Sequence, residues 1–497
     1  MWGKESKMHS FKNLKILQII CCQNMETIGP PSMFLSLLQL ESLDIRNCQK
    51  MQQVISQESE KQEIREEIIT FPKLKILRIW TSFNLKCFYG GSYQMKFPCL
   101  ETMELEILYG MKKFAGCGSS TSFFDKQSEF PCLEELQLEL SKQVTKLWDL
   151  DVLMALKNPL HKLRKLSVKK IKLPSIVFHS LSRLVVEPVN DAKVVLFSSS
   201  ENEGCVGAYS QFPKLEELVV VRCPGSIEQF VEVDDSRAML KFCGQLSNLR
   251  LNFGLNMKVI SLHLFKSLRD LTIYSMKWEY LFSANGSFEL WQSLEELNIY
   301  ECTNLEVIIR GGDRENVVDF PLLKILRMTN LTRMSKLCSI PDIPFHFESL
   351  ELIYISRCNR LETICLGPFV APSLRTLYVG YCHELESLFC GEPNQVVEFP
   401  SLEKMTINYC NAMKSCSTRP LKAPKLRKLT VSGCPKMEWF LLGNANCGAE
   451  LELPSLEDVT IAKCPNMKSF SPAILRAPKL QLVTVDDKPY PIAELKK

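Results

Sequence analysis

The 497-residue chain lacks the signatures of most catalytic and nucleotide-binding proteins. It has no Gly-x-x-x-x-Gly-Lys-Ser/Thr phosphate loop, no Gly-x-Ser-x-Gly nucleophile elbow and no His-Glu-x-x-His zinc motif. No apolar run reaches the roughly 18 residues that a membrane-spanning helix requires. We therefore expect no cofactor, no membrane span and no catalytic centre.

The sequence also has little surplus charge. It contains 60 Lys and Arg against 56 Asp and Glu, a net charge of +4. Proteins that bind nucleic acid usually concentrate far more basic charge, because the phosphate backbone dominates their affinity. A nucleic-acid partner is therefore not expected.

Cysteine is abundant, but no two of the 21 cysteines have the Cys-x-x-Cys spacing of a zinc site or an active disulfide. The pattern favours buried, reduced thiols and no metal, with a secreted disulfide framework as the alternative. Met1 to Lys15 carry five charged residues and no apolar signal-peptide core. These observations together predict a cytoplasmic protein.

One repeated pattern dominates the chain: Phe-Pro-x-Leu-x-x-Leu-x-Ile-x-x-Cys-x-x-Leu/Met-x-x-Ile/Phe, with variations. Its clearest copies begin at Trp291, Phe347 and Ala371. The spacing of the copies is in or near the roughly 20 to 29 residues of a leucine-rich repeat. The first Leu of each copy, its anchor, is Leu14, Leu40, Leu74, Leu100, Leu133, Leu163, Leu181, Leu215, Leu246, Leu268, Leu294, Leu323, Leu350, Leu374, Leu402, Leu426, Leu456 or Leu480.

The segment after each anchor alternates apolar and variable residues, which is typical of a strand with one buried face. One such row cannot bury that face alone, whereas stacked rows share a continuous core. The sequence therefore predicts an α/β leucine-rich-repeat solenoid, or horseshoe. It has a concave parallel β-sheet of about 18 rows and an irregular or short-helical convex side.

Two further columns recur within the rows. A Cys eight residues after the anchor, as in Cys302 and Cys358, is expected to stay buried while it contacts backbone groups of the turn. A Pro two residues before many anchors, as in Pro72, fits the entry to a strand. The Phe or Ala before this Pro is expected to cap the core on the convex side.

We expect one domain, because the repeats resume with the same pattern after each irregular stretch. The predicted organisation is a single solenoid over 1–490 and a C-terminal tail over 491–497, with loop insertions near 56–70, 117–128, 187–211 and 311–319.

The Phe-Pro-x-Leu-x-x-Leu and Cys-x-x-Leu/Met-x-x-Ile blocks resemble the leucine-rich-repeat region of plant nucleotide-binding disease-resistance receptors, particularly the coiled-coil class. The resemblance implies immune recognition of a pathogen effector or an altered host protein, and restraint of a nucleotide-binding switch. The missing phosphate loop departs from that family plan. We therefore expect a truncated or repeat-only relative, with a nucleotide-binding receptor as a further candidate partner.

Residues two, four and six positions after each anchor should face solvent on the concave side. In rows ten to fourteen these positions gather residue types that are enriched at interface hot spots. Tyrosine also simply suits an exposed β-surface, so both interpretations remain open. The candidate protein-binding residues are Tyr274, Tyr300, Arg327, Tyr354 and Tyr378.

Other features of the same face are weaker candidates. Trp80 lies several rows away from these tyrosines. The acidic residues of rows four and five are expected to form a solvated charged rim with Lys165 and Lys169.

Two other classes of function were weighed. An enzyme is disfavoured because the six histidines are scattered along the solenoid and no catalytic motif is present. A ubiquitin-ligase substrate adaptor, or a general interaction scaffold, also uses leucine-rich repeats. We expect an adaptor to carry a helical module before the repeats, for which the short segment before Leu14 leaves no room.

Overall fold

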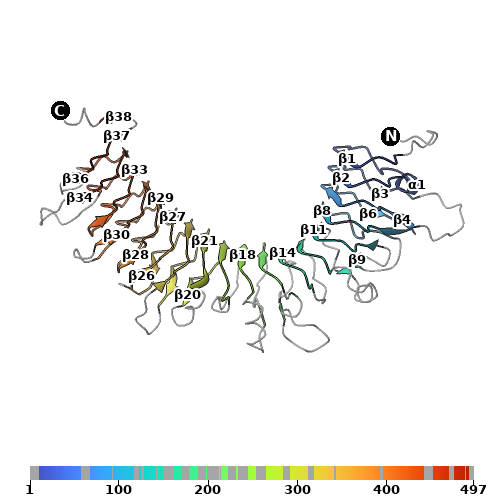
Figure 1. Cartoon of the computed structure of the whole chain (residues 1–497), viewed down its shortest axis with the longest axis horizontal. Coiled ribbons are helices and arrows are strands. Elements are labelled where there is room, and N and C mark those ends of the chain that lie inside the picture. The colour runs from blue at the N-terminus through green and yellow to red at the C-terminus, as the bar shows by residue number, and fades with distance from the viewer. Residues whose placement is uncertain are drawn as a thin grey trace. The chain divides into compact units, whose positions relative to one another are not determined.

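A computed structural model shows two compact units, Met1–Gly225 with Gln229–Phe242 and Ser226–Glu228 with Cys243–Lys497. Each unit is a stack of rows (Figure 1). The structure describes residues 11–57, 68–91, 93–116, 122–124, 128–140, 144, 146–148, 161–169, 178–187, 197–198, 212, 214–221, 231–232, 245–252, 265–283, 292–311, 318–340, 343–391, 396–440, 451–468, 475–486 and 488–491.

The main sheet of unit 1 contains one strand from each row. Neighbouring strands pair in parallel, and the same repeat position lies opposite itself from row to row, as in Leu17 opposite Leu43. The strands are β1 (Ile16–Ile20), β2 (Ser42–Arg46), β5 (Ile76–Trp80), β8 (Thr102–Leu108), β11 (Glu135–Leu140), β13 (Lys165–Lys169), β14 (Arg183–Glu187) and β16 (Glu217–Val220).

Unit 2 repeats this arrangement and ends in the antiparallel strand β38 (Lys488–Pro491). Its parallel strands are β18 (Asn248–Asn252), β19 (Asp270–Tyr274), β21 (Glu296–Tyr300), β24 (Ile325–Thr329), β27 (Leu352–Ser356), β29 (Thr376–Gly380), β31 (Lys404–Asn408), β33 (Lys428–Ser432), β35 (Asp458–Ala462) and β37 (Leu482–Val485). In the described residues, each of the 18 predicted anchors is followed by one strand. The predicted solenoid is confirmed.

The anchor leucines form the spine of the core. They are almost completely buried in every row except the first and the last described, where Leu14 and Leu480 are half-buried. The Phe before the Pro stacks on the equivalent ring of the next row, as Phe71 does on Phe97 with centroids 5.0 Å apart. This column closes the core on the side away from the main sheet, as predicted.

That opposite side is more regular than the predicted irregular or short-helical segments. Among the described residues it holds one four-residue helix, α1 (Pro31–Phe34), and a series of short parallel ladders. Their strands are β3 (Gln53–Ile55), β6 (Cys87–Tyr89), β4 (Ile68–Thr70), β7 (Gln94–Lys96), β10 (Ser128–Glu129), β9 (Ser122–Phe124), β12 (Lys146–Trp148), β15 (Phe197–Ser198), β17 (Val231–Glu232), β20 (Tyr280–Ser283), β22 (Val307–Arg310), β25 (Lys336–Cys338), β23 (Val318–Asp319), β26 (Phe345–His346), β28 (Phe369–Val370), β30 (Val397–Glu398), β32 (Leu421–Lys422), β34 (Leu451–Glu452) and β36 (Leu475–Arg476).

The expected loop insertions carry some of these short strands. β4 lies in 56–70, β9 and β10 lie in or overlap 117–128, β15 lies in 187–211 and β23 lies in 311–319. Most other residues of these ranges, and residues 492–497 of the expected tail, lie outside the described residues. In the described part of the chain, no helix has the length and apolar character needed to cross a membrane.

The cysteine column behaves as expected in most described rows, whereas Cys22 and Cys464 in the outer rows are only half-buried. Cys48, Cys302 and Cys382 are buried, and each thiol donates to the carbonyl two residues earlier at 3.4 Å. The residue just before this Cys is left-handed in most described rows, for example Tyr381 with φ 57°. Its backbone N–H donates to the next row, as Tyr381 does to the carbonyl of Asn408 at 2.7 Å. The chain thus turns sharply at the same point of each row.

Candidate functional site

The strand register sorts the five predicted binding residues into two columns of the unit 2 sheet. Tyr274 lies opposite Tyr300 at the last position of β19 and β21. Arg327, Tyr354 and Tyr378 are successive neighbours in the central column of β24, β27 and β29. All five come from one exposed face of the sheet, but they form two neighbouring groups rather than one continuous column across the strands.

The Tyr274 and Tyr300 rings are tilted against each other, with centroids 6.0 Å apart. The Tyr274 hydroxyl donates to Glu301 at 2.8 Å, and this hydrogen bond raises the pKa of Tyr274. The phenol therefore stays neutral at physiological pH. It offers a partner an aromatic surface rather than a charge.

The central column is more ordered. The rings of Tyr354 and Tyr378 stack with centroids 4.5 Å apart and an angle of 7° between their planes. Arg327 donates to Asn298 on the preceding strand at 3.3 Å. Burial raises the pKa of Tyr378, so this hydroxyl is also neutral at physiological pH.

A third tyrosine pair, not singled out from the sequence, lies at the left-handed turn that follows the strands. Tyr381 and Tyr409 stack with centroids 5.0 Å apart and an angle of 12°. The Arg357 guanidinium lies 5.9 Å from the Tyr381 ring centre, and the Lys463 ammonium lies 6.0 Å from that of Tyr409. The stacked pair is thus flanked by a cation at each end.

We call Tyr354, Tyr378, Tyr381 and Tyr409, with Arg357 and Lys463, the tyrosine face. It spans five successive rows of unit 2, from β27 to β35. Large aromatic rings and cations at the edge are the side chains that contribute most to binding at protein interfaces. The arrangement is suited to contact with another protein.

Comparison with known families identifies the repeats. The family model for the leucine-rich repeats of plant RPS2-like disease resistance proteins matches residues 1–113 and 245–370. Within these two segments the chain carries leucine-rich repeats of the RPS2-like type. A comparison with curated proteins gave no match.

Two solved structures were matched to this chain with low similarity. A TLR13 complex with ssRNA13 is 15% identical, with 90% of this chain and 78% of that chain covered and a TM-score of 0.31. The plant peptide hormone receptor RGFR1 in complex with RGF2 is 12% identical, with 95% and 92% covered and a TM-score of 0.22. Likeness at this level says nothing about the ligand of this chain.

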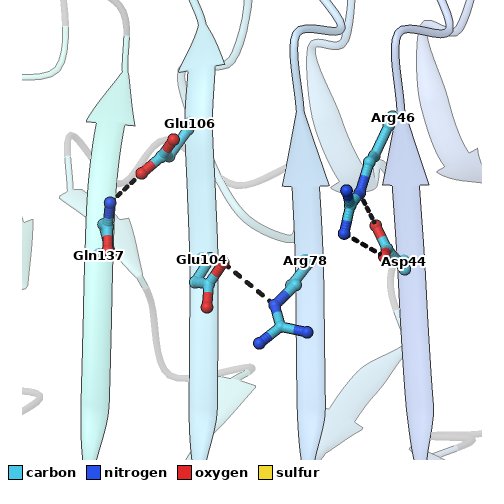
Figure 2. Close-up of polar contacts among 6 residues, drawn as sticks. All are labelled: Asp44, Arg46, Arg78, Glu104, Glu106 and Gln137. Carbon is cyan, nitrogen blue, oxygen red and sulfur yellow. Dashed lines mark hydrogen bonds and ion pairs between the residues drawn. The ribbon is translucent and has the colours of Figure 1, made fainter.

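The unit 1 face of the RPS2-like repeats differs from the tyrosine face in being charged, as predicted. Asp44 accepts two hydrogen bonds from Arg46 at 2.8 and 2.7 Å, and Arg78 pairs with Glu104 at 3.1 Å (Figure 2). Lys165 and Lys169 pair with Glu135 and Glu139, both at 2.6 Å. This charged face is therefore a set of separate ion pairs, three of which join adjacent strands.

Three thiols of these repeats are poorly suited to nucleophilic chemistry. Burial raises the pKa of Cys87 and Cys365 to about 11, and that of Cys302 to about 12. Only a thiolate is an effective nucleophile or metal ligand, and these thiols remain protonated near neutral pH. In the part of the chain that the structure describes, no three His, Cys, Asp or Glu residues converge as metal ligands.

Proposed function

We propose that this RPS2-like repeat chain is a recognition module of plant innate immunity, acts in the cytoplasm and has no catalytic activity of its own. It would bind a pathogen effector, or a host protein that an effector has modified, through the tyrosine face of unit 2. The phosphate loop is missing from these 497 residues. The proposal therefore assigns nucleotide-dependent switching to another domain or protein.

The observation that carries this proposal is the tyrosine face itself. Stacked pairs cost little conformational entropy on binding, because the rings are already held by each other and by the strands. Two cations border the Tyr381 and Tyr409 pair. The match to the RPS2-like family model supports the setting in disease resistance.

The test uses the whole chain expressed in plant cells with and without a pathogen challenge. Co-purifying proteins are compared between wild type, a Tyr378→Ala, Tyr409→Ala double variant and a Tyr109→Ala control. Tyr109 is 51% exposed and stacks on Phe83 in unit 1, so its removal matches the loss of an exposed stacked tyrosine elsewhere.

A partner that is lost only in the double variant, while circular dichroism is unchanged, supports the proposal. A partner list that is identical in all three proteins places recognition elsewhere and contradicts it. A ubiquitin-ligase scaffold subunit among the partners lost in the double variant would favour the substrate-adaptor alternative instead.

A further inference from the structure

Nine charged side chains lie on the exposed face of five adjacent strands in unit 1, β2, β5, β8, β11 and β13. Five are acidic and four are basic. Each of the four basic side chains forms an ion pair with a different carboxylate of this face. The fifth carboxylate, Glu106, takes part in none of the ion pairs found among the described residues.

The surroundings of Glu106 do not compensate its charge. The side-chain amide of Gln137 donates a hydrogen bond to its carboxylate (Figure 2). Burial raises the pKa of Glu106, and the nearby carboxylates of Glu139 and Glu104 raise it further, while Lys169 opposes them. Lys169 is already paired with Glu139, so the site remains one cation short.

A tryptophan neighbours this carboxylate on the adjacent strand. Trp80 lies directly opposite Glu106 in the register of β5 and β8. On the other side, Arg46 precedes Trp80 in the same column, and its guanidinium lies 4.4 Å from the centre of the Trp80 ring. The Trp80 ring therefore already accepts the Arg46 guanidinium in a cation–π contact. Its neighbour on the other side of the column is Glu106, a carboxylate without an ion-pair partner.

We propose that Trp80 and Glu106 bind an arginine or lysine side chain of a partner protein. Glu106 supplies the counter-charge that completes a fifth ion pair, and Trp80 supplies an aromatic surface for the alkyl or guanidinium part. Charge complementarity selects this occupant. An anionic partner would be repelled by the uncompensated carboxylate of Glu106, and a divalent metal would find only this one unpaired carboxylate beside an indole.

This inference rests on unit 1 alone and does not depend on the tyrosine face. It gives the chain a second recognition surface with a different chemistry. Trp80 and Glu106 in unit 1 would bind a basic side chain, whereas the tyrosine face of unit 2 would bind a separate partner surface. Failure of either proposal leaves the other standing.

The test is ¹⁹F NMR on the full chain, in which all six tryptophans are replaced by 5-fluorotryptophan. The Trp80 signal is assigned with a Trp80→Phe variant. The chain is titrated with an acetylated, amidated tri-arginine peptide and, in parallel, with a tri-glutamate peptide. We expect tri-arginine to shift the Trp80 signal and tri-glutamate to leave it in place.

The decisive comparison is between two variants that remove the same charge from the same face. We expect Glu106→Gln to weaken tri-arginine binding about tenfold, a change of about 1.4 kcal/mol. Glu135→Gln should change tri-arginine binding less than about twofold. Glu135 is paired with Lys165 and lies at the far end of β11, the strand next to that of Glu106. Equal weakening in both variants would show diffuse attraction and overturn the proposal.

Two other results would also overturn it. One is a Trp80 signal that does not respond to tri-arginine at millimolar concentration. The other is an equal response to tri-glutamate.

Glu106→Gln is isosteric and its amide can still accept from Gln137, so its fold is expected to be intact. If Glu106→Gln misfolds, a Glu106→Asp variant, which keeps the charge but shortens its reach, decides instead. Weaker tri-arginine binding by that variant supports the proposal, and unchanged binding contradicts it.

Discussion

The ring of Tyr378 lies over Gly380, two residues further along β29. A Cβ atom on Gly380 would lie only 2.8 Å from the Tyr378 hydroxyl oxygen. The missing side chain thus lets the ring lie down along the strand, where it stacks on Tyr354. A glycine that is unremarkable in the sequence shapes the central part of the tyrosine face.

Gly380→Ala should therefore weaken partner binding without unfolding the protein. The added methyl displaces the flexible end of Tyr378, while alanine suits a strand at least as well as glycine, so stability should change by less than about 1 kcal/mol. Binding to a partner found with the wild-type chain and the urea midpoint are measured together. Ser432→Ala, at the same position two rows away, is the control and should bind normally.

Gly433→Ala should cost more stability than Gly380→Ala. Gly433 has φ +65°, in the left-handed region, and a Cβ there would lie 2.5 Å from the Tyr409 ring. A left-handed residue other than glycine costs roughly 1–2 kcal/mol, although asparagine tolerates it better. We expect the order of urea midpoints to be wild type, then Gly433→Asn, then Gly433→Ala. Equal midpoints for all three would contradict this account.

The sequence was sufficient for the rows and their register because the leucine anchors carry a strong period and the strands alternate cleanly. It did not reveal the role of Tyr381 and Tyr409. Their position is left-handed in most described rows, yet it is filled by residues as different as Thr81, Glu301 and Lys463. The residue type therefore does not encode the turn, which the hydrogen bond to the next row imposes.

The short ladders opposite the main sheet were missed for a related reason. Strands of two or three residues, such as β30 and β32, show no alternation that can be read from sequence. They form because the main sheet fixes the rows in register and brings the segments together. The five candidate binding residues were predicted as one group, whereas the register places Tyr274 and Tyr354 in different columns of the sheet.

Thiol alkylation should separate the cysteines by burial. Cys21 is exposed, whereas Cys302 and Cys410 are buried and have pKa values raised to about 12. At pH 7.5 we expect iodoacetamide to label Cys21 readily and to label the two buried thiols only after urea is added. Peptide mass spectrometry gives the extent at each site. Rapid labelling of Cys302 in the native protein would contradict the closed row structure.

Asp44→Asn should destabilise unit 1. Asp44 is only 3% exposed and accepts both hydrogen bonds of the Arg46 guanidinium, which in turn lies over Trp80. Hydrogen bonds to charged groups are worth about 1.5–3 kcal/mol, and the half-exposed Arg46 places this pair at the lower end. We expect a loss of about 1.5 kcal/mol by urea denaturation at pH 7, and no change would show that the pair is not structural.

Glu106→Gln should have the opposite effect on stability to Asp44→Asn. The pKa of Glu106 is raised in the folded protein, so the folded state binds its proton more tightly than the unfolded chain does. Glu106 therefore stabilises the fold below its ordinary pKa, and this contribution is lost as the pH rises through the folded-state value. At pH 7 the variant should be as stable as wild type or slightly more stable. Its advantage should shrink as the pH is lowered to 4.5.

Urea midpoints for wild type, Glu106→Gln and the Glu135→Gln control at both pH values check this. Glu135→Gln removes an exposed pair with Lys165 and should change stability by less than about 1 kcal/mol. A clear loss of stability in Glu106→Gln at pH 7 would mean that the carboxylate is compensated within the chain. The carboxylate would then have no need of a partner's cation.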